Sequence, residues 1–520
     1  MTSANRYSLV VALIVALGGF LMGFDASVIS GVVGFIETEF ALTRIQLGWA
    51  VASLTLTATL AMMAAGPISD RFGRRPVLMA AALLFGVSAI YSALAPDFVS
   101  LVIARMIGGL GVGAALIIAP MYIAEIAPPA KRGRMVSFNQ FNIVLGISVA
   151  FFSNYLILRL GQSGLDWVQS LGLDAWAWRW MLGIEALPAV VYFLALFFVP
   201  ESPRWLAMHG RQTEALAVFS RFGDEETAAA NLEAVEQSIG EEAVVAQGSF
   251  RELFAPAMRL VLTIGVSIAI LQQITGINSV FFYAPMIFEQ SGVGTDASFM
   301  QAVLVGLVNL VFTVVAMALI DRIGRRPLLG IGLSGIAVCM FLLAYGFGSA
   351  GYTLAASDVD ELPQDLDRAA LQQVVDIEYQ SDVEFRQAVT SAVGEVAFQQ
   401  HESVLVSVAV DLNASLILFA ILGFVASFAI SLGPVMWVLF SELFPNTLRG
   451  LAISFAGLIN SGVSFGVQLV FPWELQKLGS SMTFLIYGVF ALVGLVLMLR
   501  ILPETRGRSL EELEEILVRR

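Results

Sequence analysis

The 520-residue chain is too apolar for an ordinary soluble protein. Hydrophobic residues make up 58% of it and charged residues only 13%, and the formal net charge is −13. A bilayer core of about 30 Å needs about 20 apolar residues per spanning helix, so the chain has room for about a dozen spans with modest loops. The composition therefore excludes a freely soluble domain and predicts an all-α membrane protein.

Apolar runs of spanning length follow one another along the whole chain. The first continues past Met22 without a small-residue cleavage site, so we interpret it as a span and not as a cleaved signal. The pattern predicts twelve transmembrane helices in two sets of six, at 8–31, 47–68, 77–95, 98–125, 135–160, 178–199, 260–288, 300–320, 328–349, 412–440, 450–472 and 481–502.

Lys and Arg residues gather in the loops on the same side as both termini. The opposite set of loops holds few cations: Arg44, Arg159, Arg179, Arg368, Arg386 and Lys477. Positively charged loops stay in the cytoplasm, so we expect cytoplasmic termini and a multi-pass protein of the cell (inner) membrane.

Two long loops suggest the domain boundaries. We expect an N-terminal six-helix bundle at 1–200, a cytoplasmic helical linker at 201–257 and a C-terminal bundle at 258–520, with an external insertion at about 351–411. The insertion carries twelve acidic residues and only two Arg. A solvated insertion and a binding module both fit this composition, and we favour the solvated insertion.

Three loop motifs occur once in each half of the chain. Each pair follows equivalent spans, which indicates parallel repeats related by an axis along the membrane normal. The pairs are DRFGRRP at 70–76 with DRIGRRP at 321–327, E-x-x-P-x-x-x-R-G at 125–133 and again at 442–450, and PESPR at 200–204 with PETR at 503–506.

These motifs resemble those of the sugar porter family of the major facilitator superfamily. The resemblance covers nearly the whole chain outside the acidic insertion and includes five further strings: GFDASVISG at 23–31, PMYIAE at 120–125, WRWM at 178–181, QQITGIN at 272–278 and GPVMW at 433–437. It implies the major facilitator fold and transport of a sugar or polyol by alternating access. We expect the lipid bilayer and that small molecule as partners, no nucleic acid, no cofactor beyond a coupling proton, no metal, and a functional monomer.

Asp25, Arg105 and Glu185 are ionisable residues well inside predicted spans. At 1.5 Å per residue each lies about 9 to 10 Å from the external end of its span, so the three can meet. Separating a carboxylate from a neighbouring guanidinium favours its protonation, which would couple a proton to a conformational change. A static ion pair explains the spacing equally well. The resemblance favours coupling, with Asp25 as proton carrier, Arg105 as its switch and Glu185 as an accessory.

Amide side chains in the seventh span suit a sugar, because they both donate and accept hydrogen bonds. Gln272, Gln273 and Asn278 cannot share one face of a continuous helix, but a break at Gly276 would let them converge. Hydrogen bonding between helices is the alternative role. The resemblance favours substrate binding and adds Asn309, Trp437 and Asn460.

Further residues follow from the same resemblance. Phe282 and Tyr283 correspond to aromatic residues of an external gate. Ile147 and Ser461 stand where the family often has Gln and Trp, which leaves a hexose, a pentose and a polyol open as substrates.

Arginine and glutamate residues at the cytoplasmic ends of the spans suggest a reversible gate of ion pairs. Topogenic charge alone would explain the arginines but not the matched glutamates. The residues are Arg74, Arg75, Glu125, Arg132, Glu201, Arg204, Arg325, Arg326, Glu442, Arg449 and Glu504.

The sequence thus predicts a proton-coupled sugar symporter. A facilitative uniporter of the same fold and a sugar sensor on a transporter scaffold remain alternatives. An enzyme is not expected, because no nucleophile, base and orienting group occur at catalytic spacing.

Overall fold

The computed structural model describes residues 3–127, 132–222, 225–244, 250–360, 362–363, 366–445, 447–508 and 512–513. Eleven helical segments among them are long and apolar enough to cross a membrane. The last one, Arg449–Ile501, contains both the eleventh and the twelfth predicted span. The two spans meet at Gly479, where the backbone is not helical. The prediction of an all-α membrane protein is confirmed.

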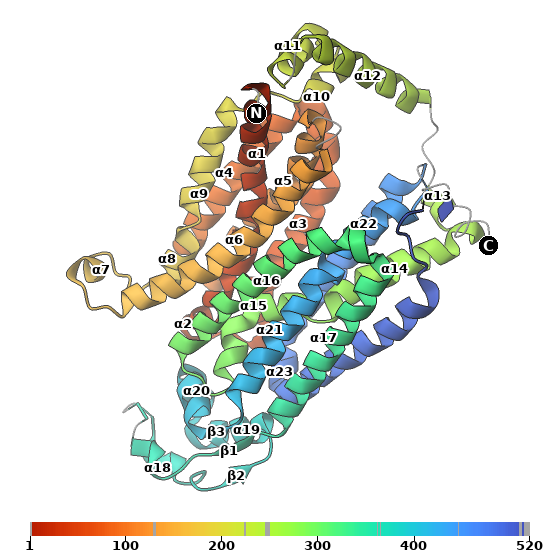
Figure 1. The fold of residues 1–520 in the computed structure, drawn as a ribbon. Helices are drawn as coiled ribbons and strands as arrows, with labels where there is room; N and C mark the ends of the chain where they lie inside the picture. The colour runs from red at the N-terminus through yellow and green to blue at the C-terminus, as the bar shows by residue number, and fades with distance from the viewer. Residues whose placement is uncertain are drawn as a thin grey trace.

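The first bundle holds α1 to α9 (Figure 1, red to yellow). Side chains fix where two of its helices begin: Thr43 and Gln46 form a capping box before α3, and the Asp97 carboxylate accepts from the N–H of Ser100 before α5. The elements are α1 Ser3–Val28, η1 Ile29–Gly31, α2 Val33–Glu39, α3 Arg44–Phe72, α4 Arg74–Ala93, α5 Phe98–Ile126, α6 Arg132–Gly161, α7 Asp166–Ser170, α8 Ala177–Gly183, α9 Ala186–Ala195 and η3 Leu196–Phe198.

A set of short helices connects the two bundles. They lie at the end of the molecule where α1 begins, which we call the termini end (Figure 1). They are α10 Pro203–Met208, α11 Gln212–Phe222, α12 Glu225–Val244, α13 Phe250–Leu253 and η4 Pro256–Met258.

The second bundle holds α14 to α17 and α21 to α23 (Figure 1, green to blue). Gly479, at φ 80°, lies between the two spanning parts of α23. The elements are α14 Arg259–Ile274, α15 Ile277–Glu289, α16 Thr295–Ile323, α17 Arg325–Gly348, α21 Ala414–Ile430, α22 Leu432–Leu443 and α23 Arg449–Ile501.

Three predicted spans are broken in the middle. The sixth breaks between α8 and α9, where Pro188 has no N–H to donate to the carbonyl of Ile184. The seventh breaks at Gly276, whose φ of 90° favours glycine. The tenth breaks at Ser431, three residues before Pro434. The break expected at Gly276 is confirmed.

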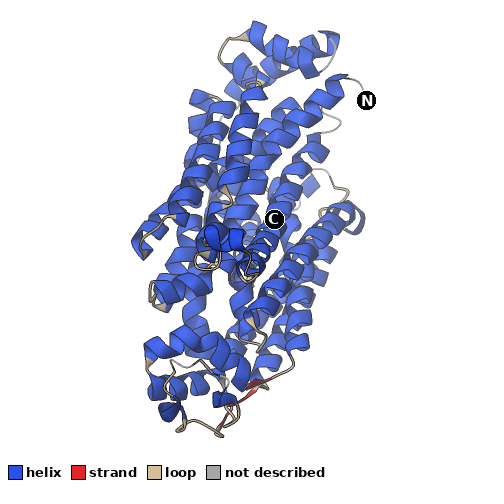
Figure 2. Cartoon of the chain, turned by 90° about the vertical axis from the view of Figure 1, so that its left-hand side faces the viewer, coloured by secondary structure: helices blue, strands red, loops and turns tan. Residues whose placement is uncertain are grey.

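The 351–411 insertion is folded. It has a hydrophobic core of its own, which includes Tyr352, Leu371 and Phe385. Strands occur in this part of the described chain, at the end opposite the termini end, which we call the insertion end (Figure 2). Its elements are β1 Gly351–Thr353, η5 Asp358–Asp360, α18 Arg368–Leu371, β2 Glu378–Tyr379, α19 Asp382–Val393, α20 Glu395–Ala409 and β3 Val410–Asp411, with an antiparallel sheet in the order β2-β1-β3.

The two bundles are joined toward the insertion end. There the first bundle shares one continuous core with the second, whereas the part of the first bundle nearer the termini forms a separate core. Thr55 of α3 donates to Gln468 of α23 (2.9 Å), and Ser148 of α6 donates to the Gly306 carbonyl of α16 (2.8 Å). The shared core closes the space between the bundles at the insertion end.

Candidate functional site

The amide side chains predicted to bind substrate converge in the second bundle. Asn278 donates to the Gln273 side chain (2.8 Å), and Gln273 donates to Asn460 (3.2 Å). Asn460 donates to Gln272 (2.8 Å), which in turn donates to the Leu432 carbonyl (3.2 Å) beside the break in the tenth span. The turn at Gly276 makes this possible, because it redirects α15 relative to α14. We call these four side chains the amide network.

Two other predicted substrate residues lie outside the amide network. Asn309 is buried in α16, and in the described part of the chain no hydrogen bond joins its side chain to the network. Trp437 of α22 is 45% exposed and packs edge-on against Phe440, with 5.9 Å between ring centres.

The amide network extends along α23 to residues that the sequence analysis missed. Asn278 also donates to Ser464 (2.7 Å), and Gln468 donates to Ser464 (2.8 Å). Asn460, Ser464 and Gln468 are four residues apart and so share one helix face. That spacing of polar residues in an apolar span was a signal that could have identified them.

The two aromatic residues predicted as an external gate are buried on the insertion-end side of the amide network. Tyr283 donates to the Gln468 carbonyl (3.0 Å) and packs on Phe471 at 5.2 Å. Its backbone, at φ −123° and ψ 18°, interrupts α15 two residues before Pro285. Phe282 is 8% exposed and belongs to the core shared by both bundles.

The three charges predicted inside the spans meet in the first bundle. Arg105 of α5 forms an ion pair with Asp25 of α1 and donates to the Asp25 main-chain carbonyl (3.0 Å). Glu185 lies at the break between α8 and α9 and interacts electrostatically with both. All three are at most 2% exposed, and one oxygen of each carboxylate has no hydrogen-bond partner among the described residues. We call these residues the charged cluster.

Glycines on α5 let the neighbouring helices approach. A Cβ on Gly108 would lie 2.7 Å from the Asp25 carboxylate and 2.5 Å from Ser88 Oγ, and a Cβ on Gly109 would lie 2.3 Å from the Leu54 carbonyl. The glycine-rich stretch 108–113 therefore serves helix packing and gives the Asp25 carboxylate its place against α5.

At the termini end the first bundle contains one network of predicted gate residues. Arg74 pairs with Glu125 (3.1 Å) and with Asp70 (2.8 Å). Glu201 accepts from the main-chain N–H groups of Arg74 (2.9 Å) and Arg75 (3.3 Å). Burial raises the pKa of Glu201, although these N–H donors favour its charged form.

The second bundle repeats this arrangement. Arg325 pairs with Glu442 (2.7 Å), and Glu504 accepts from the N–H groups of Arg325 (3.1 Å) and Arg326 (3.2 Å). The repeated sequence motifs thus fold into repeated networks, each within its own bundle.

The remaining predicted gate residues are Arg449, Arg204 and Arg132. Arg449 donates to the Phe444 carbonyl (3.2 Å), and Arg204 lies in α10. Arg132 is the first residue of α6, and its side chain lies outside the part of the chain that is described.

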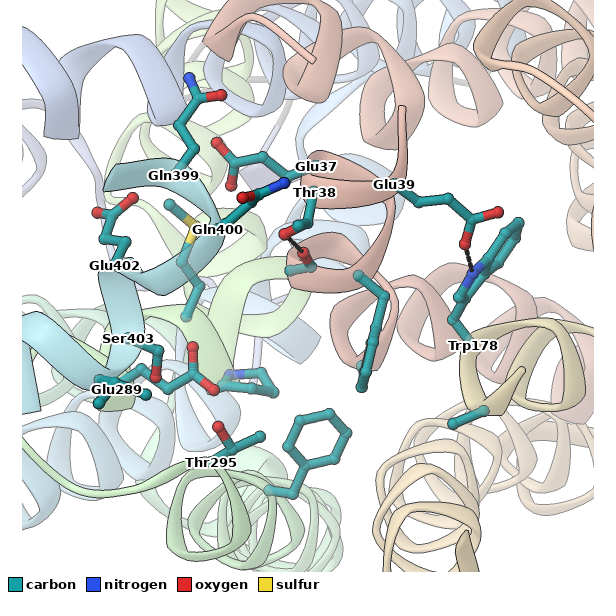
Figure 3. A pocket seen from close by; sticks show the side chains of 18 of the residues that line it. Glu37, Thr38, Glu39, Trp178, Glu289, Thr295, Gln399, Gln400, Glu402 and Ser403 are labelled. Atoms are coloured by element: carbon teal, nitrogen blue, oxygen red, sulfur yellow. Dashed lines mark hydrogen bonds between the residues drawn. The ribbon is translucent and has the colours of Figure 1, made fainter. Parts of the chain in front are cut away.

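A cavity of about 520 Å³ lies at the insertion end, between the two bundles and the insertion. Its labelled side chains come from α2, α8, α15, α16 and α20 (Figure 3). Glu39 accepts from Trp178 (2.5 Å) on one wall, and Glu37 and Glu402 lie near Arg44, which also lines the cavity. The sequence analysis had counted Arg44 only as a loop charge, because its partner Glu402 lies 358 residues away.

The chain is similar in sequence to known sugar transporters. The profile described as "Sugar (and other) transporter" matches residues 11–357 and 389–517 and leaves out the middle of the insertion. The chain is 34% identical to the arabinose-proton symporter of Bacillus subtilis over 99% of this chain and 96% of the relative. It is 33% identical to the D-xylose-proton symporter of Escherichia coli over 98% and 96%.

Solved structures agree in fold. The inward-open conformation of the E. coli xylose transporter XylE has a TM-score of 0.74 at 31% identity, covering 97% of this chain and 99% of XylE. XylE bound to 6-bromo-6-deoxy-D-glucose has a TM-score of 0.68 at 32% identity, covering 99% and 100%. The chain therefore belongs to the sugar porter family of the major facilitator superfamily.

Proposed function

We propose that this protein is a proton-coupled symporter of a neutral sugar or polyol that works by alternating access. The observation that carries the proposal is the buried Asp25–Arg105 ion pair with Glu185 beside it. A charge inside a membrane span costs roughly 2.5 to 3.5 kcal/mol on insertion scales, so three together favour a function that needs them. Relatives at 33% and 34% identity are named as proton symporters of xylose and arabinose, which supports the same coupling here.

The proposed coupling uses the two carboxylates as one unit. Pairing with Arg105 favours the ionised form of Asp25, and helix movement that separates the two favours uptake of a proton by Asp25. Asp25 and Glu185 each have one carboxylate oxygen without a hydrogen-bond partner among the described residues. A proton can bind to such an oxygen without breaking an existing hydrogen bond. Arg105 is then the switch and Glu185 the accessory carboxylate.

The proposed substrate site is the amide network with Trp437. Amide groups match sugar hydroxyls as donors and acceptors, and the exposed face of Trp437 offers a surface for the apolar face of a sugar ring. Phe282 and Tyr283 would close this site toward the insertion end, and the Arg–Glu networks at the termini end would form the second gate. Asn309 joins the site in this proposal only through a movement of α16.

The proposed setting is the cell membrane, with the termini end in the cytoplasm and the insertion outside. We propose a monomer with domains at 1–200, 201–257 and 258–520, and the proton as the only coupling partner. The concentration of cations in the loops at the termini end supports this orientation.

The test is sugar uptake into proteoliposomes, with arabinose, xylose, glucose and myo-inositol, the sugars and polyol named for the relatives, as the panel. Wild type is compared with Asp25→Asn, with and without an imposed proton gradient. Accumulation above equilibrium that vanishes in Asp25→Asn, while counterflow exchange persists, supports symport. Equal, gradient-independent equilibration by both proteins identifies a uniporter instead, and no uptake of any member contradicts the sugar site.

A further inference from the structure

We propose that the folded insertion is a latch that holds the insertion end of the transporter closed, through a buried ion pair between Arg44 and Glu402. The proposal rests on the alternating-access part of the proposed function. It concerns a segment that lies partly outside the family profile, which omits residues 358–388.

The insertion is fixed to the second bundle. Strand β1 follows α17 and strand β3 leads into α21. The two strands pair with each other, with Gly351 opposite Asp411. Asp382 accepts from the Ser480 N–H (3.0 Å) and hydroxyl (3.2 Å), directly after the turn at Gly479 in α23. These ties make the insertion move with the second bundle as one body.

From there the insertion reaches the first bundle. Glu402 of α20 pairs with Arg44, the first residue of α3, at 2.8 Å, and the two side chains are 16% and 6% exposed. A second pair across the bundles, Arg159–Asp296 at 2.7 Å, is 53% and 44% exposed. Solvent screens the exposed pair, so the Arg44–Glu402 pair is the stronger link.

Each partner of this link keeps a second counter-charge on its own side. Arg44 also pairs with Glu37 of α2 at 2.7 Å, and Glu402 also pairs with Arg386 of α19. Burial disfavours the charged form of Glu402, but Arg386 and Arg44 outweigh it and hold the pKa of Glu402 below its usual value. Separation therefore leaves neither Arg44 nor Glu402 as an unpaired buried charge, whose cost would otherwise lock the state permanently.

Both partners of the link line the cavity at the insertion end. Residues of α20 form one wall, and residues of α2 and η1 form another, including Ser30, which is 2% exposed. Opening this end separates the first bundle from the insertion, and the Arg44–Glu402 pair must break for that to occur. The latch thus favours the conformation that is closed at the insertion end.

The test measures opening directly. A Ser30→Cys substitution in a Cys339→Ser background gives one thiol on the cavity wall, and its labelling rate by a bulky polar maleimide is measured in detergent without sugar or gradient. We expect Glu402→Gln and Arg44→Gln each to raise the rate at least about fivefold, the lower end of typical coupling between sites. Asp296→Asn, which removes the exposed pair, should leave it within twofold.

Arg386→Gln separates the latch from the stability of the insertion. It removes the pair within the insertion and keeps Arg44–Glu402, so the latch predicts less than a twofold change. A rate in Glu402→Gln within twofold of the parent overturns the proposal, and so does an equal rise in Arg386→Gln. The labelling result does not depend on transport, so failure of the uptake test and failure of the latch are distinguishable.

Discussion

The interiors of the two bundles differ, although their loops repeat. At the termini end, Arg74 with Glu125 and Glu201 has its counterpart in Arg325 with Glu442 and Glu504. Inside, the first bundle has the charged cluster and the second has the neutral amide network. The comparison teaches that the repeat is preserved in the networks at the termini end and has diverged in the interiors, where one bundle holds charged groups and the other neutral amides.

The largest expected effect comes from removing the positive charge of the charged cluster in the first bundle. Arg105→Leu leaves Asp25 and Glu185 buried without a counter-charge, and loss of one partner of a buried pair typically costs about 3 to 5 kcal/mol. Thermal unfolding in detergent should show a strongly lowered melting temperature. Arg159→Leu is the control, because Arg159 is a half-exposed member of an ion pair with Asp296, and it should cost under about 1 kcal/mol. Equal shifts would contradict a special role of the cluster.

The stability of the first bundle should depend on pH through Glu37 of α2. Burial raises the pKa of Glu37 from 4.5 to about 7, despite Arg44, so the folded protein binds a proton here that the unfolded chain releases above pH 4.5. Stability should therefore fall as pH rises from about 4.5 to 7, by at most about 3 kcal/mol. Glu402, whose pKa is lowered, contributes stability that is fully present above pH 4.5 and is lost only as pH falls below it, so it does not change the slope between pH 4.5 and 7.

The measurement is the melting temperature between pH 5 and 8 for the wild type and Glu37→Gln. The substitution should reduce the slope over this range without removing it, because Glu289 lies on the same cavity and remains titratable. Groups that face Glu37 are Arg44 of α3, Glu402 of α20 and Arg386 of α19, and Glu289 of α15 lines the same cavity. An unchanged slope in Glu37→Gln would assign the pH dependence to another group.

A smaller effect, on sugar affinity, is expected from changing the amide network of the second bundle. Asn460→Ala removes donors to Gln272 and to the Ala269 carbonyl and an acceptor for Gln273, so sugar affinity should fall about tenfold, corresponding to about 1 to 2 kcal/mol. Equilibrium sugar binding to the purified protein measures this. Asn309→Ala, outside the network, should have a smaller effect, and the reverse order would move the site toward α16.

The smallest expected effect concerns the packing around Asp25. Gly108→Ala places a methyl group against the Asp25 carboxylate and Ser88, and overpacking of this kind costs about 1 kcal/mol or slightly more. Gly86→Ala in α4 is the matched control, since its Cβ meets only the Ala189 Cβ at 3.8 Å, an ordinary contact, and alanine favours the helix. Melting temperatures should move in opposite directions.

Periodic and local signals were enough to predict much of this molecule. Apolar runs identified the spans, the repeated motifs identified the paired networks, and the depths of Asp25, Arg105 and Glu185 identified their meeting. The break at Gly276 was predictable because the amide side chains needed it. Each of these predictions depends either on residues that are close in sequence or on the regular spacing of residues along a helix.

Contacts between distant segments were not predictable in this way. The composition of the insertion did not predict its fold, because its core arises from apolar residues such as Tyr352 and Phe385 scattered among acidic ones. Arg44 with Glu402 has no local pattern, because the partners come together only when the insertion folds against α3. The break at Glu185 was missed since Pro188 was not considered as a helix breaker.

The ladder between β1 and β3 has a consequence for how this chain is organised. Since Gly351 and Asp411 are neighbours across that ladder, the insertion leaves the bundle and returns to it at a single point. A segment attached in this way is a module: it can be exchanged or shortened to a tight hairpin while α17 and α21 keep their spacing. The insertion thus leaves and rejoins the twelve-span transporter at one point of the chain, so changes within it can alter one end of the molecule and leave the interiors of the bundles unchanged.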